Sequence, residues 1–166
     1  MGFSITLSEI IILVASVILA SGFSAYAIQS GILIQNNIMQ SLTDARTVLN
    51  TRVSIAYATL NDSTSPAHFI VYAKNTGMNP ITNFNLVDVY FGEYGKAKLY
   101  TYDKNASPGS GKFSLEDCDG DGVWEVAETA VIRIYPETNI YLSIYEVRIA
   151  PYKGLQDIYI FTAPSG

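Results

Sequence analysis

The sequence predicts an α+β protein, in which one long N-terminal transmembrane and stalk helix is followed by an antiparallel β-sandwich. Residues 10–28 form an apolar run of about the 20 residues that a helix needs to cross a bilayer core. A helical spacing of apolar residues then continues to about residue 50. From residue 51 the spacing changes to two, and β-branched and aromatic residues dominate. The predicted parts are therefore a helix at 1–50 and a β-domain at 51–166.

Composition and motifs argue against several classes of protein. The net charge is -5 and the basic residues form no cluster, which argues against nucleic-acid binding. Cys118 is the only cysteine, so an intrachain disulfide and a cysteine-based zinc site are both excluded. The chain has no G-x-S-x-G, no phosphate-binding glycine loop and no H-E-x-x-H, and we expect it not to be an enzyme.

The apolar run lies in a segment without Asp, Glu, Lys or Arg between Glu9 and Asp44. A secretory signal peptide is the alternative to a transmembrane helix, but residues 1–9 lack the basic residues that such a peptide carries. Glu9 follows Ser8 and admits two interpretations. It would favour the positive end of the helix dipole at a helix start, or it would pair with the N-terminal amine of a neighbouring subunit, because an unpaired charge in lipid is costly.

Beyond residue 28 an apolar stripe continues along the predicted helix. Its members recur every three or four residues and therefore share one helix face. They are Ile34, Ile38, Leu42, Ala45 and Leu49. Such a stripe on an otherwise polar stalk predicts helix packing against the protein's own β-domain, a second copy, or a helix of another protein.

Short runs with a period of two predict the strands of the β-domain. These runs cover residues 51–61, 68–75, 81–91, 96–102, 130–135, 141–150 and 155–162. Clusters rich in Gly, Pro, Asn, Asp and Ser separate them, as at residues 61–66 and 136–139. Seven short strands with such turns are typical of an immunoglobulin-like sandwich.

Residues 117–128, DCDGDGVWEVAE, match the calcium-loop pattern D-x-D-x-D-G-x5-E at every specified position. Calcium takes six to eight oxygen ligands. The predicted ligands are Asp117, Asp119, Asp121, the carbonyl of Val123, Glu125 and Glu128. The flanking segments KFSLE and TAVIRIYP are strand-like, which predicts a loop between strands rather than between helices. The alternative is an acidic hairpin loop that is merely exposed to solvent. Trp124 is expected to anchor packing.

Two N-x-S sequons begin at Asn61 and Asn105. Both are expected in loops, where they would be possible glycosylation acceptors if the β-domain lies outside the cell. Three-residue sequons are also common by chance, so both interpretations stay open.

Several segments resemble one family. The opening MGFSITLSEIIILVASVILASGFSAYA is similar to the N-terminal anchors of the archaellum accessory proteins F and G, within the archaeal type IV pilin-like group. VYAKNTGMNPITNFNLVDVYFG resembles the β-domain of the same proteins, and the acidic stretch resembles loops common in archaeal pilins and archaellum proteins. The resemblance implies a membrane-anchored stator protein whose immunoglobulin-like domain lies outside the cytoplasmic membrane. It also implies two partners, the surface-layer protein and other accessory subunits.

A filament subunit is the alternative within this group. Archaellins and pilins resemble one another in having a basic pre-sequence that a peptidase removes, and no basic residue precedes the apolar run after Met1. This favours an uncleaved accessory protein. If the sequence is a processed form, a pilin or archaellin is the better interpretation, with Glu9 and the stripe through Leu49 packed against identical subunits in a filament core. Membrane orientation rests on the resemblance, because basic residues near the helix are sparse.

Overall fold

The computed structural model describes residues 2–65, 67–137 and 140–163. The chain divides into two compact units, Met1–Asp44 and Ala45–Gly166. The predicted turns at residues 61–66 and 136–139 lie partly outside the described residues.

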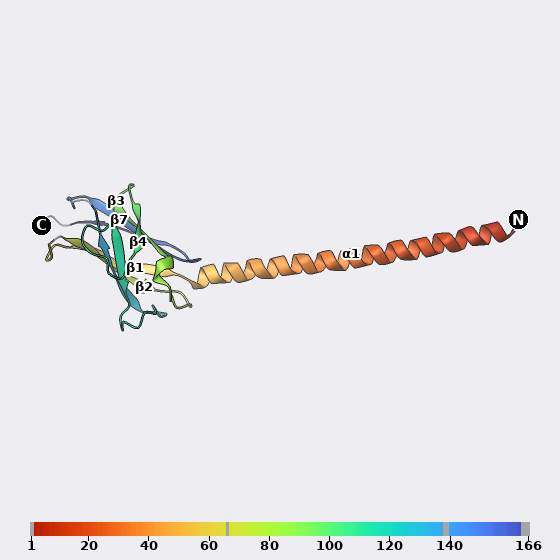
Figure 1. Ribbon diagram of the computed structural model, residues 1–166, viewed down its shortest axis with the longest axis horizontal. Coiled ribbons are helices and arrows are strands. Elements are labelled where there is room, and N and C mark those ends of the chain that lie inside the picture. Colours follow the sequence, from red (N-terminus) through yellow and green to blue (C-terminus); the bar gives the residue numbers. More distant parts are fainter. Residues whose placement is uncertain (1, 66, 138–139, 164–166) are drawn as a thin grey trace. The chain divides into compact units, whose positions relative to one another are not determined.

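The N-terminal part is one uninterrupted helix, α1 (Gly2–Asn50), of 49 residues (Figure 1). At 1.5 Å per residue it is about 74 Å long, more than twice the roughly 30 Å apolar core of a bilayer. Within the described part of the chain it is the one helix long and apolar enough to span a membrane, and none of its most apolar window is buried. The expectation that Glu9 stabilises the helix start is wrong, because the helix begins at Gly2 and has no acidic residue in its first turn.

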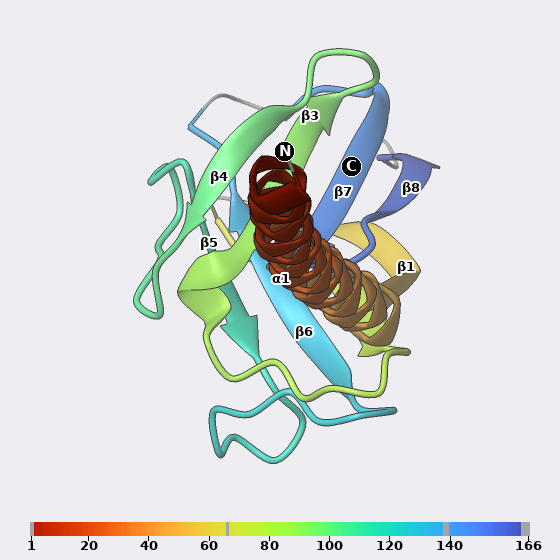
Figure 2. The ribbon, with the colours of Figure 1, turned by 90° about the vertical axis from the view of Figure 1, so that its right-hand side faces the viewer.

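The second unit contains eight strands in one sheet. They are β1 (Val53–Asn61), β2 (His68–Asn75), β3 (Val87–Glu93), β4 (Lys98–Tyr102), β5 (Lys112–Glu116), β6 (Thr129–Tyr135), β7 (Ile144–Pro151) and β8 (Asp157–Thr162). Their order in the sheet is β1-β2-β6-β5-β4-β3-β7-β8. Figure 2 shows β4, β3, β7 and β8 following one another in this order. Every neighbouring pair is antiparallel except β4 and β5, which pair in parallel over two residues.

The sheet folds back on itself, so that its two edge strands lie beside each other. The main-chain nitrogen of Leu155 donates to the oxygen of Thr51 at 2.9 Å, and the nitrogen of Ile55 donates to Asp157 Oδ2 at 2.7 Å. Between the two halves, the ring of Phe69 on β2 lies 4.4 Å from that of Phe91 on β3. The apolar core is therefore enclosed between the halves of one sheet.

The predicted long helix and antiparallel β-domain are confirmed, but one strand is added and five of the predicted strands begin later. The runs predicted from residues 51, 81, 96, 141 and 155 begin at Val53, Val87, Lys98, Ile144 and Asp157. KFSLE forms an eighth strand, β5, beside the acidic loop. The strand expected at residues 81–91 begins only at Val87, because Asn83 caps a short 3-10 helix, η1 (Phe84–Leu86), by accepting a hydrogen bond from the nitrogen of Asn85. The narrower assignment to an immunoglobulin-like sandwich stays a prediction.

The β-unit has two ends, which can be defined by the pairing of β1 with β2. At the helix-proximal end Val53 lies opposite Asn75, and at the distal end Asn61 lies opposite His68. The last helical residue, Asn50, accepts main-chain hydrogen bonds from the segment that follows β2, including one of 2.7 Å from the nitrogen of Met78. The helix therefore ends in a hydrogen-bonded junction at the helix-proximal end.

Candidate metal centre

The acidic loop, residues 117–128, connects β5 to β6, as the sequence predicted for a loop between strands. It lies at the helix-proximal end, because the main-chain oxygen of Glu128 accepts a 2.9 Å hydrogen bond from the nitrogen of Asn75. The loop and the helix junction therefore share one end of the β-unit.

The structure brings the five predicted carboxylate ligands together in two overlapping groups. In each group one oxygen from every member lies within 4.8 Å of the others. The groups are Asp117, Asp119, Glu128 and Asp119, Asp121, Glu125. Asp119 belongs to both, which places it at the centre of the cluster. The ligand role of these residues, and of the Val123 carbonyl, stays a prediction.

Glycines with a positive φ angle shape the first half of the loop. Gly122 has a φ of 87°, a conformation that a side chain disfavours. The nitrogen of Gly122 donates to Asp117 Oδ2 at 2.9 Å, and that of Val123 donates to Asp121 Oδ1 at 2.8 Å. The turn therefore needs glycine at the position where the calcium-loop pattern specifies it.

Both carboxylate oxygens of Glu128 hold the loop together. Oε1 accepts from the nitrogen of Cys118 at 2.5 Å, and Oε2 accepts from the nitrogen of Glu125 at 2.7 Å. Through these two hydrogen bonds alone, Glu128 joins the beginning of the loop to its end. The Glu128 carboxylate also lies close to those of Asp117 and Asp119, with which it would share a bound ion.

The environment favours charge on two carboxylates and opposes it on a third. Desolvation raises the pKa values of Asp117 and Glu128, but the hydrogen bonds from backbone nitrogens outweigh it and hold both below their ordinary range. The hydrogen bond with Glu128, followed by desolvation, raises the pKa of Glu125. A bound cation would relieve this crowding of negative charge.

Trp124 and Asn75 form the buried base of the loop. Trp124 is fully buried, which confirms that it anchors packing, and its indole nitrogen donates to the oxygen of Glu128 at 3.0 Å. The side-chain nitrogen of Asn75 donates to the oxygen of Trp124 at 3.0 Å and to that of Asn79 at 2.9 Å. Asn75 was not predicted as a functional residue from the sequence. Its only signal is its place at the start of the segment NTGMNP, residues 75–80, which is rich in turn-forming residues.

The predicted assembly residues lie on the surface of α1. Glu9 and all five stripe residues are exposed, and three of the five, Ile34, Ile38 and Leu42, line one shallow groove with Asn37 and Ser41. Exposure agrees with a packing face but does not identify a partner, so the assembly role stays a prediction.

The two sequons differ in their surroundings. Asn61 is the last residue of β1, half-buried rather than in a loop, and its Oδ1 accepts hydrogen bonds from the nitrogen and the hydroxyl of Ser63. Asn105 is exposed between β4 and β5, and its nitrogen donates to Asp103 Oδ1 at 2.9 Å. Asn105 is therefore the more accessible of the two predicted acceptors.

Comparison with known proteins places this architecture among proteins of the archaeal flagellum. The chain belongs to the archaeal-type flagellin family, whose model matches residues 2–161. This confirms the relationship to archaellum proteins that the sequence suggested. A comparison with curated protein sequences found no match.

Solved structures share the fold at low sequence identity. The periplasmic stator protein FlaG of the Sulfolobus acidocaldarius archaellum is 23% identical, over 67% of this chain and 99% of that one, with a TM-score of 0.54. The flagellum of Methanospirillum hungatei is 15% identical, over 96% and 94%, with a TM-score of 0.69. The flagellin FlaB1 of Methanocaldococcus jannaschii is 13% identical, over 69% and 90%, with a TM-score of 0.51.

Proposed function

We propose that the protein is a non-enzymatic, membrane-anchored accessory subunit of the archaellum that acts as a stator. Residues 1–50 form its transmembrane helix and stalk, and residues 51–166 form an extracytoplasmic β-domain. The supporting observation is the likeness of this chain to the stator protein FlaG, which extends over 99% of that chain at 23% identity. The identities with the two filament proteins are lower, at 15% and 13%.

In this role the β-domain binds the surface-layer protein and partner accessory subunits. A second solved structure similar to this chain is a complex of the stator proteins FlaF and FlaG, also at 23% identity. That structure supports a complex of this chain with a partner accessory subunit. A stator needs both contacts, because it must hold the motor against a fixed layer outside the membrane.

A filament subunit is the second candidate, and a separate observation favours it. The likeness to the Methanospirillum hungatei flagellum covers 96% of this chain, and therefore includes most of α1. Apolar side chains of α1 stay exposed from Leu7 to Leu49, which is longer than a bilayer core requires. Packing identical helices into a filament core would bury this excess.

Electron microscopy of the full-length protein, extracted from membranes in mild detergent, separates the two candidates. Mass spectrometry of the same sample would establish its N-terminal residue. Discrete particles with Met1 intact are expected for a stator, and they should bind purified surface-layer protein in a pull-down. Ordered filaments with helices in a central core would overturn the stator proposal in favour of a pilin-type or archaellin subunit.

We further propose that the acidic loop binds calcium through Asp117, Asp119, Asp121, Val123, Glu125 and Glu128. The sequence pattern and the convergence of five carboxylates support this proposal, since together with the Val123 carbonyl they would supply at least six oxygens, and calcium takes six to eight. Bound calcium would stabilise the loop by linkage. Through Asn75 it would also stabilise the segment on which α1 ends.

We propose that Asn105 is glycosylated. Asn61 would be glycosylated only when the end of β1 opens enough to admit the modifying enzyme. Asn105 is exposed whereas Asn61 is half-buried, which supports Asn105 as the more readily modified of the two. Peptide mass spectrometry of the protein from its native membrane tests both positions, and an unmodified Asn105 would contradict the proposal.

A further inference from the structure

Strand β8 is an edge strand that β1 accompanies only in part. β8 follows β3 and β7 at one end of the sheet (Figure 2). Two hydrogen bonds link its segment to that of β1, one from Leu155 to Thr51 and one from Ile55 to Asp157, and both lie at the helix-proximal end. Beyond Asp157 no hydrogen bond joins the two strands among the described residues. The backbone of residues 158–162 therefore has an open edge.

The two edge strands differ in how well they resist pairing with a further strand. The register of β1 with β2 shifts between Ile55 and Tyr57, and such an irregularity protects a sheet edge. β8, with the sequence DIYIFT, contains no lysine, proline or glycine. Its register with β7 runs without a break from Asp157 to Thr162. β8 is therefore suited to accept another strand.

The outer face beside this edge carries apolar side chains. Alternate residues of β7 and β8 face the core, among them Tyr145 and Phe161, which lie opposite each other. The residues between them face outward, and three of these are isoleucines. Ile144 is 52% exposed, Ile158 is 45% exposed and Ile160 is 51% exposed. Together they form an apolar patch of the kind that marks a contact with another protein.

The charged residues of β7 and β8 are already engaged within the β-unit. Nη2 of Arg148 donates to Glu146 Oε1 at 3.1 Å, and Glu146 is only 3% exposed. Asp157 accepts the hydrogen bond from the nitrogen of Ile55. The chain has a net charge of -5, so two copies repel each other on average. At this edge they can meet without bringing unpaired like charges together.

A second copy fits this edge through a two-fold axis at Ile160. Ile160 is the middle residue of the open segment 158–162, and antiparallel pairing about it would place Ile158 opposite Thr162 of the second copy. Residues with even numbers then pair with one another, so the outward-facing residues of both copies share one face. Each β1 would lie beyond the paired segment, because it accompanies β8 only at the helix-proximal end.

We propose that β8 pairs in antiparallel fashion with β8 of a second copy, so that the strands β3, β7 and β8 of two β-units form one continuous sheet. The outward isoleucines of both copies would form one apolar surface across the junction. The contact is isologous, since the same strand serves on both sides. The inference goes beyond the stator and filament roles and depends on neither, because it concerns neither a surface layer nor the packing of α1.

Cysteine cross-linking of the full-length protein in its native membrane tests this pairing. All variants carry Cys118→Ala, which removes the only cysteine. Ile160→Cys should form a covalent dimer with diamide as the oxidant, because opposite residues of antiparallel strands lie within disulfide distance. Ile158→Cys should form none, since its own copy would lie about 13 Å away along the strands. The double variant I158C/T162C should restore the dimer.

The control for this experiment is Tyr72→Cys, which places a cysteine at an exposed, outward position on β2. Non-reducing electrophoresis should show no dimer of this variant. Equal dimer yields from Ile160→Cys and Tyr72→Cys, or no dimer from Ile160→Cys, would overturn the proposal. Mass spectrometry of the product identifies its two chains. A disulfide that joins Ile160→Cys to a different protein would overturn the second copy in favour of a strand from that protein.

Analytical ultracentrifugation of the full-length protein in mild detergent measures the same contact without a covalent bond. In I158K/I160K the dissociation constant of the dimer should rise about tenfold or more, because apolar contacts are lost and four like charges are brought together. The control Y57K/Y72K replaces two exposed tyrosines of β1 and β2 and should associate as the wild type does. Matching thermal melts would show that both variants fold. Equal association of I158K/I160K and the control would overturn the proposal, while the binding of surface-layer protein by the same samples still tests the stator role.

Discussion

The side-chain amide of Asn75 donates a 3.0 Å hydrogen bond to the main-chain oxygen of Trp124, and so joins the end of β2 to the acidic loop. The same amide donates to the oxygen of Asn79 at 2.9 Å. The nitrogen of Asn79 in turn donates to the oxygen of Asn50, the last residue of α1, at 3.1 Å. One buried side chain thus lies between the candidate metal loop and the helix junction.

Replacing Asn75 with alanine should destabilise the β-unit by about 2–4 kcal/mol, because a fully buried amide with three hydrogen bonds is removed. Chemical denaturation followed by the fluorescence of Trp124, the only tryptophan, measures this change. Lys74→Ala is the control, because the neighbouring Lys74 side chain points into solvent on the same strand. A loss in Asn75→Ala no larger than in the control would contradict the structural role of Asn75.

Gly77→Ala should also destabilise the junction, through crowding rather than lost hydrogen bonds. A Cβ at this position would collide with the carbonyl oxygen of Asn50 and lie 2.7 Å from the nitrogen of Arg52. Both are backbone atoms that cannot rotate away, so we expect a loss of about 1–3 kcal/mol. The same denaturation assay measures it, with the exposed neighbour Met78→Ala as the control. Equal stabilities would mean that the junction can move apart freely.

Calcium should raise the melting temperature of the wild type and should not do so in Asp119→Asn. Asp119 is the best test because it belongs to both carboxylate groups, whereas Glu128 also has a structural role through its backbone partners. A calcium concentration 100 times the dissociation constant would stabilise the wild type by about 2.7 kcal/mol. The control, Asp88→Asn, removes an exposed carboxylate on β3 and should keep the full calcium response. Identical wild-type melts in calcium and in chelator would reject the site.

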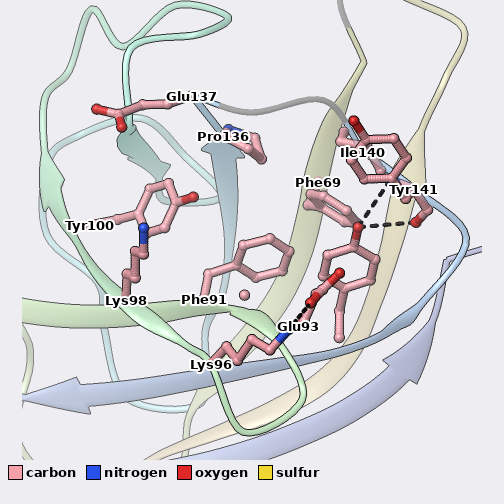
Figure 3. A pocket seen from close by; sticks show the side chains of 12 residues that line it. Phe69, Phe91, Glu93, Lys96, Lys98, Tyr100, Pro136, Glu137, Ile140 and Tyr141 are labelled. Carbon is pink, nitrogen blue, oxygen red and sulfur yellow. Dashed lines mark hydrogen bonds and ion pairs between the residues drawn. The ribbon is translucent and has the colours of Figure 1, made fainter.

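The sequence predicted those features that depend on local patterns. The apolar period gave α1, the period of two gave most strands, and the spacing of Asp117 to Glu128 gave the loop. Asn75 was missed, because its burial depends on Asn79 and Trp124 packing around it. The cavity lined by residues of β2, β3, β4 and β7 (Figure 3) was missed for the same reason, since strands distant in the sequence supply its walls. No periodicity in one segment reports such a contact between segments.

His68 should make the protein less stable as the pH falls. Burial, and then the charge of Arg133, lower the pKa of His68 in the folded state, while the unfolded pKa is near 6.5. Below pH 6.5 the unfolded chain therefore binds a proton that the folded chain does not, and stability falls until the folded pKa is reached. Chemical denaturation at pH 7.5 and 5.5 should show a smaller loss in His68→Gln than in the wild type. An equal loss in both would exclude His68 as the cause.

Leu42→Glu should prevent association of α1 with a partner helix while leaving the β-unit folded. Leu42 is 52% exposed and lines a groove with Ile34 and Ile38, and burying such a side chain stabilises an interface by about 1.5–3 kcal/mol. A glutamate at this position would lose this burial free energy and would place a desolvated charge in the interface. Mass photometry in detergent measures the copy number, and Gln40→Glu places the same charge at an already polar, exposed position as the control. Unchanged association of Leu42→Glu would show that the contacts between subunits lie elsewhere on the chain.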